Sequence, residues 1–246
     1  MKVLLIGDSC EDRYFYGDVK RLNPEAPVPI LEYKRGVTSK GMALNVRENL
    51  ISFGVEVYLS THPEQIIKTR YIDEKSNQQI MRYDEEPKIK PLSFDYPKEW
   101  YSEYDALVIS DYDKGFLTTE RIFELSSRFV GPVFIDSKKT VLPEDAYIKV
   151  NELEYERMSH SNYENLIITR GGEGAEYQGE IYPAEKVNVF DVVGAGDTFL
   201  AALTYGYLKY GRIDKAIPLA NKAASIAVSH IGTYVLTKED IDEILY

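Results

Sequence analysis

Short apolar runs that alternate with helical segments most constrain how this chain of 246 residues can fold. The runs are apolar at consecutive positions, which is typical of strands that are buried on both faces. Strands in alternation with helices indicate an α/β fold, in which helices cover a mostly parallel sheet. The sequence predicts strands at 2–8, 106–111, 133–136, 147–151 and 165–170, and helices at 39–53, 118–129, 196–210, 214–230 and 238–245.

A polar side chain stands at the carboxyl end of every predicted strand. In parallel sheets, ligands bind in the crevice beyond these ends, where the loops carry most functional residues. The pattern therefore favours a ligand site at this edge, although ordinary loop polarity would look the same. The residues are Asp8, Asp111, Asp136, Asn151 and Arg170.

Two segments interrupt the alternation. Residues 14–33 contain Pro24, Pro27 and Pro29, which exclude a helix and favour an edge or solvent-side ribbon. Residues 67–83 alternate partly around a polar stretch at 73–77, which predicts a hairpin. Together they predict a small β-layer that projects from the α/β body. The chain shows no linker, so we expect one domain over residues 1–246.

The excess of acidic residues limits the classes of partner that the chain can bind. A formal net charge of −11 repels the phosphate backbone, so we expect no nucleic-acid binding. No apolar run approaches the roughly 20 residues that cross a bilayer, so we expect no membrane partner. The single cysteine excludes an internal disulfide, and the histidines lack zinc-site spacing. These bounds predict a soluble, cytoplasmic protein without a structural metal site.

The most informative stretch, 188–200, holds a Gly-Ala-Gly turn that leads directly into a predicted helix. Glycine lets the backbone approach a ligand closely, and the unpaired first-turn amides of a helix bind phosphate. Asp197 inside this anion site could hold a hydroxyl nucleophile, which would suit phosphoryl transfer to an alcohol. The alternative is an acidic residue that merely caps a helix.

Other phosphate-binding and nucleophile motifs do not fit. The P-loop pattern and the Gly-x-Ser-x-Gly elbow are absent. Gly194-x-Gly196 imitates a dinucleotide fingerprint, but the third glycine is replaced by Phe199 and the motif lies far from the first strand. A Rossmann-type oxidoreductase is therefore a weak alternative.

The stretch at 191–197, Asp-Val-Val-Gly-Ala-Gly-Asp, resembles the C-terminal signature of the ribokinase (PfkB) family of carbohydrate kinases. Further blocks at 7–17, 21–29, 77–84 and 110–115 are similar to bacterial heptose-7-phosphate kinases, most specifically Pro-Glu-Ala-Pro-Val-Pro and Asn-Gln-Gln. The resemblance implies a ribokinase-like three-layer sandwich with a small β-lid at about 12–35 and 67–84. It also implies ATP and Mg²⁺ as cofactors, a sugar phosphate as substrate and a homodimer through the lid.

The resemblance also implies residue roles. Asp197 would be the catalytic base, with Gly194, Ala195 and Gly196 as the anion hole. The sugar-phosphate side would comprise Asp12, Arg13, Asn45, Lys68, Arg70, Asp111, Tyr112 and Lys114. The nucleotide side would comprise Lys138, Asn151, Thr169, Arg170, Gly171, Gly174 and Asn221, and Glu154 would help to place magnesium.

The sequence departs from the family pattern in four ways. Lys40 precedes Gly41 where the family has Gly-Gly, and could contact a phosphate or block the sugar pocket. Val193 replaces a threonine. Compared with the family pattern, helix-sized segments are missing before residue 68 and between residues 158 and 166, and the chain resembles a kinase half alone. We expect an ATP-dependent kinase of a phosphorylated sugar, with heptose 7-phosphate favoured; the alternative is a non-catalytic sugar-phosphate or nucleotide-binding protein.

Overall fold

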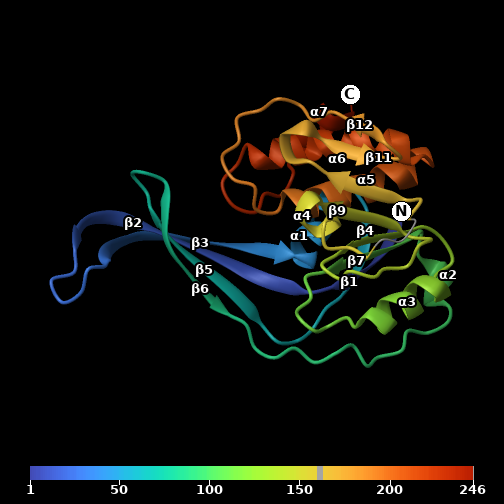
Figure 1. Ribbon diagram of the computed structural model, residues 1–246, viewed down its shortest axis with the longest axis horizontal. Helices are drawn as coiled ribbons and strands as arrows, with labels where there is room; N and C mark the ends of the chain where they lie inside the picture. The colour runs from blue at the N-terminus through green and yellow to red at the C-terminus, as the bar shows by residue number, and fades with distance from the viewer. Residues whose placement is uncertain (160–162, 246) are drawn as a thin grey trace.

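Two β-sheets organise residues 1–159 and 163–245, the part of the chain that the computed structural model describes (Figure 1). The larger sheet has eight strands in the order β12-β11-β10-β9-β8-β7-β1-β4. Six are parallel, and the β11–β12 hairpin joins one edge in antiparallel fashion. The bounds are β1 Lys2–Gly7, β4 Glu56–Ser60, β7 Ala106–Asp111, β8 Val133–Ser137, β9 Tyr147–Asn151, β10 Leu166–Thr169, β11 Ala175–Tyr177 and β12 Glu180–Tyr182.

Helices cover both faces of the large sheet, which confirms the three-layer α/β sandwich. In Figure 1, α5–α7 lie above the sheet in orange and red, and the green helices α2 and α3 lie below it. Within β1, Val3 and Leu5 pack in one core, and the alternate residues Leu4 and Ile6 pack in the other. The helices are α1 Ala43–Ser52, α2 Trp100–Glu103, α3 Thr119–Arg128, α4 Glu152–Tyr155, the short 3₁₀ helix η1 Gly171–Glu173, α5 Ala195–Tyr210, α6 Ile213–Val228 and α7 Lys238–Leu245.

The smaller sheet projects from the body as the predicted β-layer, on the left in Figure 1. Its strands, in the order β3-β2-β5-β6, are β2 Ser9–Leu22, β3 Pro29–Met42, β5 Ile66–Asp73 and β6 Gln78–Glu85. Pro24 and Pro27 lie in the turn between β2 and β3, and Pro29 is the first residue of β3. We refer to this sheet as the lid.

The predicted elements are confirmed, with one correction at the first helix. The five predicted strands correspond to β1 and β7–β10, and the predicted hairpin is β5–β6. The prediction of helix over residues 39–42 was wrong, because these residues extend β3 and pair with β2, Ser39 opposite Asp12 and Met42 opposite Ser9. The β11–β12 hairpin was not predicted.

Within residues 1–159 and 163–245, none of the helices combines the length and apolar character that crossing a bilayer would require.

Candidate active site

The start of α5 meets the carboxyl ends of the central strands, and this junction forms the candidate site. Gly194 precedes the helix in a left-handed conformation, with φ at 80°, and a β-carbon there would lie 2.7 Å from Asn45 Nδ2. The amide of Ala195 bonds to the Val192 carbonyl, whereas among the described residues the amides of Gly196 and Asp197 have no acceptor. The first turn of α5 therefore presents two free amides, and in the described part of the chain the amide of Gly194 just before it has no acceptor either. Of the predicted anion-hole residues, only Ala195 has its amide occupied.

Asp197 is buried in the first turn of α5, and two side chains bond to its carboxylate. The Tyr112 hydroxyl donates to Oδ1 over 2.7 Å, and Asn45 Nδ2 donates to Oδ2 over 3.3 Å. Asn49 donates to Asn45 Oδ1, which directs the amide nitrogen of Asn45 toward Asp197. Asn45 is fully buried, and its contacts in this structure are with Asp197, Gly194 and Asn49.

The environment of Asp197 favours its protonated form. Burial raises the pKa of this carboxyl group to about 7, and the negative charge of Asp136 acts in the same direction. The hydrogen bonds from Tyr112 and Asn45 and the charge of Lys149 oppose this rise. A carboxyl group with this pKa can accept a proton from a bound hydroxyl near neutral pH.

Tyr112 is held in place by Asp8 at the end of β1. Asp8 Oδ2 accepts hydrogen bonds from the backbone amides of Tyr112 and Lys114, at 2.8 and 3.2 Å. The carboxylate of Asp111 contacts the Ser137 hydroxyl and the Lys139 ammonium, so it supports the loop. Asp8 was outside the predicted site residues, although its position at a strand end was a signal for it.

Asp136 and Lys149 form a buried ion pair beneath α5. They are register neighbours on β8 and β9, and Lys149 Nζ lies 2.7 Å from Asp136 Oδ2. Burial lowers the pKa of Lys149, but attraction to Asp136 outweighs it and the pKa is raised overall. Sequence analysis missed Lys149, although a lysine within the otherwise buried strand at 147–151 was a visible signal.

The lid contributes charged groups on the face that turns toward Asp197. Asp12 pairs with Arg70 on that face, and both are buried. Lys68 is the register neighbour of Asp12, and its Nζ lies 5.9 Å from the centre of the Tyr112 ring. Lys114 pairs with Glu86, both carboxylate oxygens lying 2.7 Å from Nζ.

Two expected contacts of the lid are corrected by strand alternation. Successive side chains of a strand point to opposite faces, so Arg13 lies on the face opposite to Asp12, where it pairs with Glu11. Lys40 is the register neighbour of Glu11, is exposed and pairs with Glu48 at 3.0 Å. Neither residue reaches the site, so Lys40 neither contacts a phosphate there nor blocks the sugar pocket.

Two lysines stand beside Tyr112 without an acidic partner. Lys138 Nζ lies 4.8 Å from the Tyr112 ring centre, and Lys68 approaches the same ring. In the described part of the chain, no carboxylate lies within 4.0 Å of either ammonium group. These uncompensated positive charges in an acidic protein make the surroundings of Asp197 suitable for anionic ligands.

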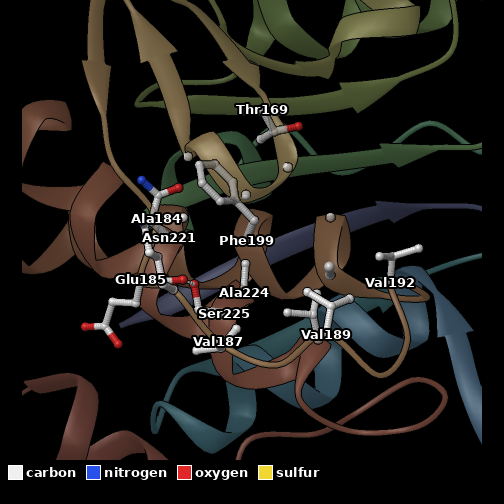
Figure 2. A pocket seen from close by; sticks show the side chains of 17 residues that line it. Thr169, Ala184, Glu185, Val187, Val189, Val192, Phe199, Asn221, Ala224 and Ser225 are labelled. Atoms are coloured by element: carbon white, nitrogen blue, oxygen red, sulfur yellow. Dashed lines mark hydrogen bonds between the residues drawn. The ribbon is translucent and has the colours of Figure 1, made fainter.

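A cavity of about 360 Å³ opens beside the first turn of α5, and no residue of the lid lines it (Figure 2). Thr169, Gly171, Gly174 and Asn221 of the expected nucleotide side line it, next to Ala195 and Gly196. Most of the remaining wall is apolar, with Val187, Val189, Phe199, Ala224 and Val228 among its side chains, and Glu185, Lys186 and Ser225 also line it. Arg170 is directed elsewhere, because Glu176 and Glu152 hold its guanidinium group.

Asn151 and Glu154 bond to each other at the start of α4. Asn151 Oδ1 accepts from the Glu154 amide and Glu154 Oε2 from the Asn151 amide, both over 2.9 Å. Within the described residues, no group of three or more His, Cys, Asp or Glu side chains could cage a metal ion. Magnesium usually binds through one or two carboxylates together with substrate phosphates, and Glu154 fits that pattern.

Comparison with known sequences places the chain in a family. Residues 45–240 match the family described as pfkB family carbohydrate kinase. The bifunctional protein HldE of Nitratiruptor sp. is 31% identical over 297 residues, covering 98% of this chain and 64% of that protein. HldE of Helicobacter acinonychis is 31% identical over 307 residues, covering 99% and 66%. The chain thus spans slightly less than two thirds of these relatives.

The alignments also support the expectation that segments are trimmed. Both are longer than the 246 residues of this chain, so the relatives contain internal stretches that it lacks. Only residues 61–65 connect β4 to β5, at one of the two expected positions. The other falls on residues 160–162, outside the described residues.

Solved structures confirm the ribokinase-like fold. Ribokinase from Thermotoga maritima matches with a TM-score of 0.70 at 17% identity, covering 99% of this chain and 98% of that chain. Arabidopsis thaliana ribokinase, solved with ribose and ATP, matches with a TM-score of 0.67 at 14% identity, covering 99% and 98%.

The raised pKa of Asp197 predicts a pH-dependent effect of Asp197→Asn on stability. The folded protein retains this proton up to about pH 7, whereas the unfolded chain releases it near pH 3.8. The stability of the wild type therefore falls as pH rises from about 3.8 to about 7, because in this range the unfolded chain has released the proton that the folded protein still holds. Above about pH 7 this contribution of Asp197 to stability no longer changes. From pH 5 to pH 8, the unfolding free energy of Asp197→Asn relative to wild type should increase by about 3 kcal/mol, measured by urea denaturation.

Asp214→Asn is the matched control. Its exposed carboxylate pairs with Arg212, which lowers the pKa of Asp214, so this group titrates below the tested range. The difference for Asp214→Asn should stay constant between pH 5 and pH 8. A constant difference for Asp197→Asn as well would show that the pKa of Asp197 is not raised.

Proposed function

The chain belongs to the pfkB family of carbohydrate kinases, and we propose that it transfers the γ-phosphoryl group of ATP to a hydroxyl group of heptose 7-phosphate. Because the chain belongs to a kinase family, the oxidoreductase alternative is dropped. The observation that carries the proposal is the buried carboxylate of Asp197 beside two free helix amides, between a glycine-lined cavity and the charged face of the lid.

Asp197 would act as the general base. The Tyr112 hydroxyl donates to Asp197 Oδ1 over 2.7 Å, and the acceptor alcohol would take the place of this hydroxyl. As the sugar oxygen bonds to the γ-phosphorus and the bond to ADP breaks, the alcohol proton passes to Asp197. Asn45 and Asn49 fix the orientation of the carboxylate during this step.

The amides of Gly196 and Asp197 would stabilise the charge of the transferred group. They point outward from the positive end of α5 and need no rearrangement to meet an anion. Lys138 lies beside Tyr112 and has no acidic partner among the described residues, so its ammonium group would add positive charge near these amides. Electrostatic stabilisation of this kind supplies much of the rate enhancement in phosphoryl transfer.

The cavity beside Gly196 suits the nucleotide. Its apolar wall fits a purine ring, and the glycines at 171, 172 and 174 allow phosphates and ribose to approach the backbone. Family membership implies ATP as the donor. Glu154 and Asn151 would help to hold Mg²⁺, which would supply positive charge to neutralise the phosphates.

The charged face of the lid suits a sugar that already carries a phosphate. Asp12 could accept hydrogen bonds from sugar hydroxyl groups, and the ammonium group of Lys68 is free to meet a phosphate. The choice of heptose 7-phosphate rests on the sequence blocks at 21–29 and 77–84 that resemble heptose-7-phosphate kinases. The HldE relatives are consistent with this choice.

We also propose that the lid forms a homodimer in the cytoplasm. Tyr33, Met81 and Tyr83 are large lid side chains with more than half of their surface exposed, and a partner lid would cover them. Sedimentation equilibrium of the wild type should give the mass of a dimer. Tyr83→Lys should shift the equilibrium toward monomer, and a monomeric wild type at all concentrations would contradict this proposal.

A sugar-kinase assay tests the proposed reaction. ADP release should require a phosphorylated sugar and should be fastest with heptose 7-phosphate, when compared with fructose 6-phosphate and unphosphorylated heptose. Asp197→Asn should lower kcat by about 10²- to 10⁴-fold with little change in ATP affinity, because it removes the base but leaves both amides. For the wild type, kcat/KM should rise up to about pH 7 and then level off.

Asp214→Asn serves again as the control with unchanged turnover, since its carboxylate lies on the surface against Arg212. Near-normal activity of Asp197→Asn would disprove the base role.

Val193 and the trimmed segments favour the second candidate, a non-catalytic sugar-phosphate and nucleotide-binding protein. Tight binding of both ligands by calorimetry, with no ADP release from any sugar phosphate, would establish that candidate instead.

Lys68→Met tests recognition of the substrate phosphate. The KM for heptose 7-phosphate should rise by about tenfold or more, the usual size of a charge-assisted hydrogen bond, while the KM for ATP stays constant. Lys75→Met, in the exposed turn between β5 and β6, should change neither value. An unchanged KM for the sugar phosphate in Lys68→Met would place its phosphate elsewhere.

A further inference from the structure

Lys149 is a charged residue in the interior of the large sheet. It lies on β9, only 5% of its surface is exposed, and its strand neighbours Ile148 and Val150 are fully buried. Ile148 and Val150 face the core on the α3 side, so by strand alternation Lys149 faces the α5 side. A lysine in such a position carries a large desolvation cost unless charged groups meet it.

The ammonium group of Lys149 lies against the first turn of α5. A β-carbon added at Gly196 would be only 2.8 Å from Lys149 Nζ and 3.9 Å from Asp136 Oδ2. Glycine at 196 therefore lets the ammonium group approach the same turn that presents the free amides of Gly196 and Asp197. The Lys149–Asp136 pair forms the floor of this anion site.

The ammonium group of Lys149 lies between buried carboxylates and the first turn of α5. The N-terminal end of a helix carries partial positive charge, so cations there are unfavourable and anions are favourable. In the resting protein, Asp136 pairs with the ammonium group, and the charges of Glu154 and Asp197 also favour its protonated form, while the free amides of α5 lie beside it. Buried ion pairs also contribute little net stability compared with apolar side chains of similar size. An anion bound at the turn would meet both the ammonium group of Lys149 and the free amides of Gly196 and Asp197.

We propose that Lys149 is a further catalytic residue, whose ammonium group binds the phosphoryl group that passes from ATP to the sugar. The inference rests on the proposed kinase reaction at Asp197. During transfer, the bond from phosphorus to the ADP oxygen breaks, the bond to the sugar oxygen forms, and the alcohol proton goes to Asp197. Lys149 keeps its protons throughout and moves from Asp136 alone to a position shared by Asp136 and the phosphoryl oxygens.

Nucleotide binding to Lys149→Met tests this assignment. Calorimetry with ATP, ADP and adenosine, performed in EDTA, measures the contact of the phosphates with the protein without a bridging metal. The variant should bind ATP about tenfold or more weakly than the wild type, with ADP less affected and adenosine unchanged. In the kinase assay, kcat should fall while the KM for the sugar phosphate stays constant.

If Lys149→Met lost affinity for ATP and for adenosine equally, or kept its ATP affinity unchanged, Lys149 would have only a structural role. Lys222→Met is the control, because Lys222 on α6 donates to the Glu243 carbonyl on α7, and this variant should leave all three affinities unchanged. Two measurements on the wild type test the kinase function separately from the role of Lys149. They are the binding of adenosine by calorimetry and the release of ADP in the kinase assay.

A double variant keeps the test valid if Lys149→Met does not fold. Removal of Lys149 alone leaves Asp136 buried without a partner, whereas Lys149→Met/Asp136→Asn removes both charges. Compared with Asp136→Asn alone, the double variant should lose ATP affinity and retain adenosine affinity. Equal ATP affinities of these two variants would contradict the proposal.

Discussion

The carboxylate of Asp197, buried at the positive end of α5, is the interaction on which the site depends. Its place requires glycine at 194, where the chain turns with positive φ against Asn45, and a helix that begins without a side-chain cap. The same turn leaves two amides free for an anion. A proton acceptor and an anion site thus come from one short segment of backbone.

The two sheets supply the two sides of this turn. The large sheet brings Asp8, Asp136 and Lys149 to its carboxyl edge, where Asp8 fixes the loop that carries Tyr112. The lid adds a second charged face, with Lys68 directed toward the Tyr112 ring. The glycine-lined cavity lies on one side of Asp197 and the cationic side chains of the lid on the other, an arrangement that would suit the proposed transfer between two bound substrates.

Local patterns in the sequence predicted the elements and the centre of the site. Consecutive apolar residues identified β1 and β7–β10, and the Gly-Ala-Gly turn identified Asp197, because both signals depend on neighbours in the chain. Arg13 and Lys40 were misplaced, because only pairing in the lid decides which strand face each side chain occupies. Asn45 and Lys149 acquire their roles through partners about 150 and 13 residues away, at Asp197 and Asp136, and spacing alone does not reveal such contacts.

A crystal structure with a non-hydrolysable ATP analogue and heptose 7-phosphate tests the central claim most directly. The account predicts the γ-phosphate at the amides of Gly196 and Asp197, with one sugar hydroxyl in hydrogen-bond contact with Asp197 in place of Tyr112. A γ-phosphate bound away from α5, or Asp197 still closed by Tyr112 with both ligands present, would contradict it.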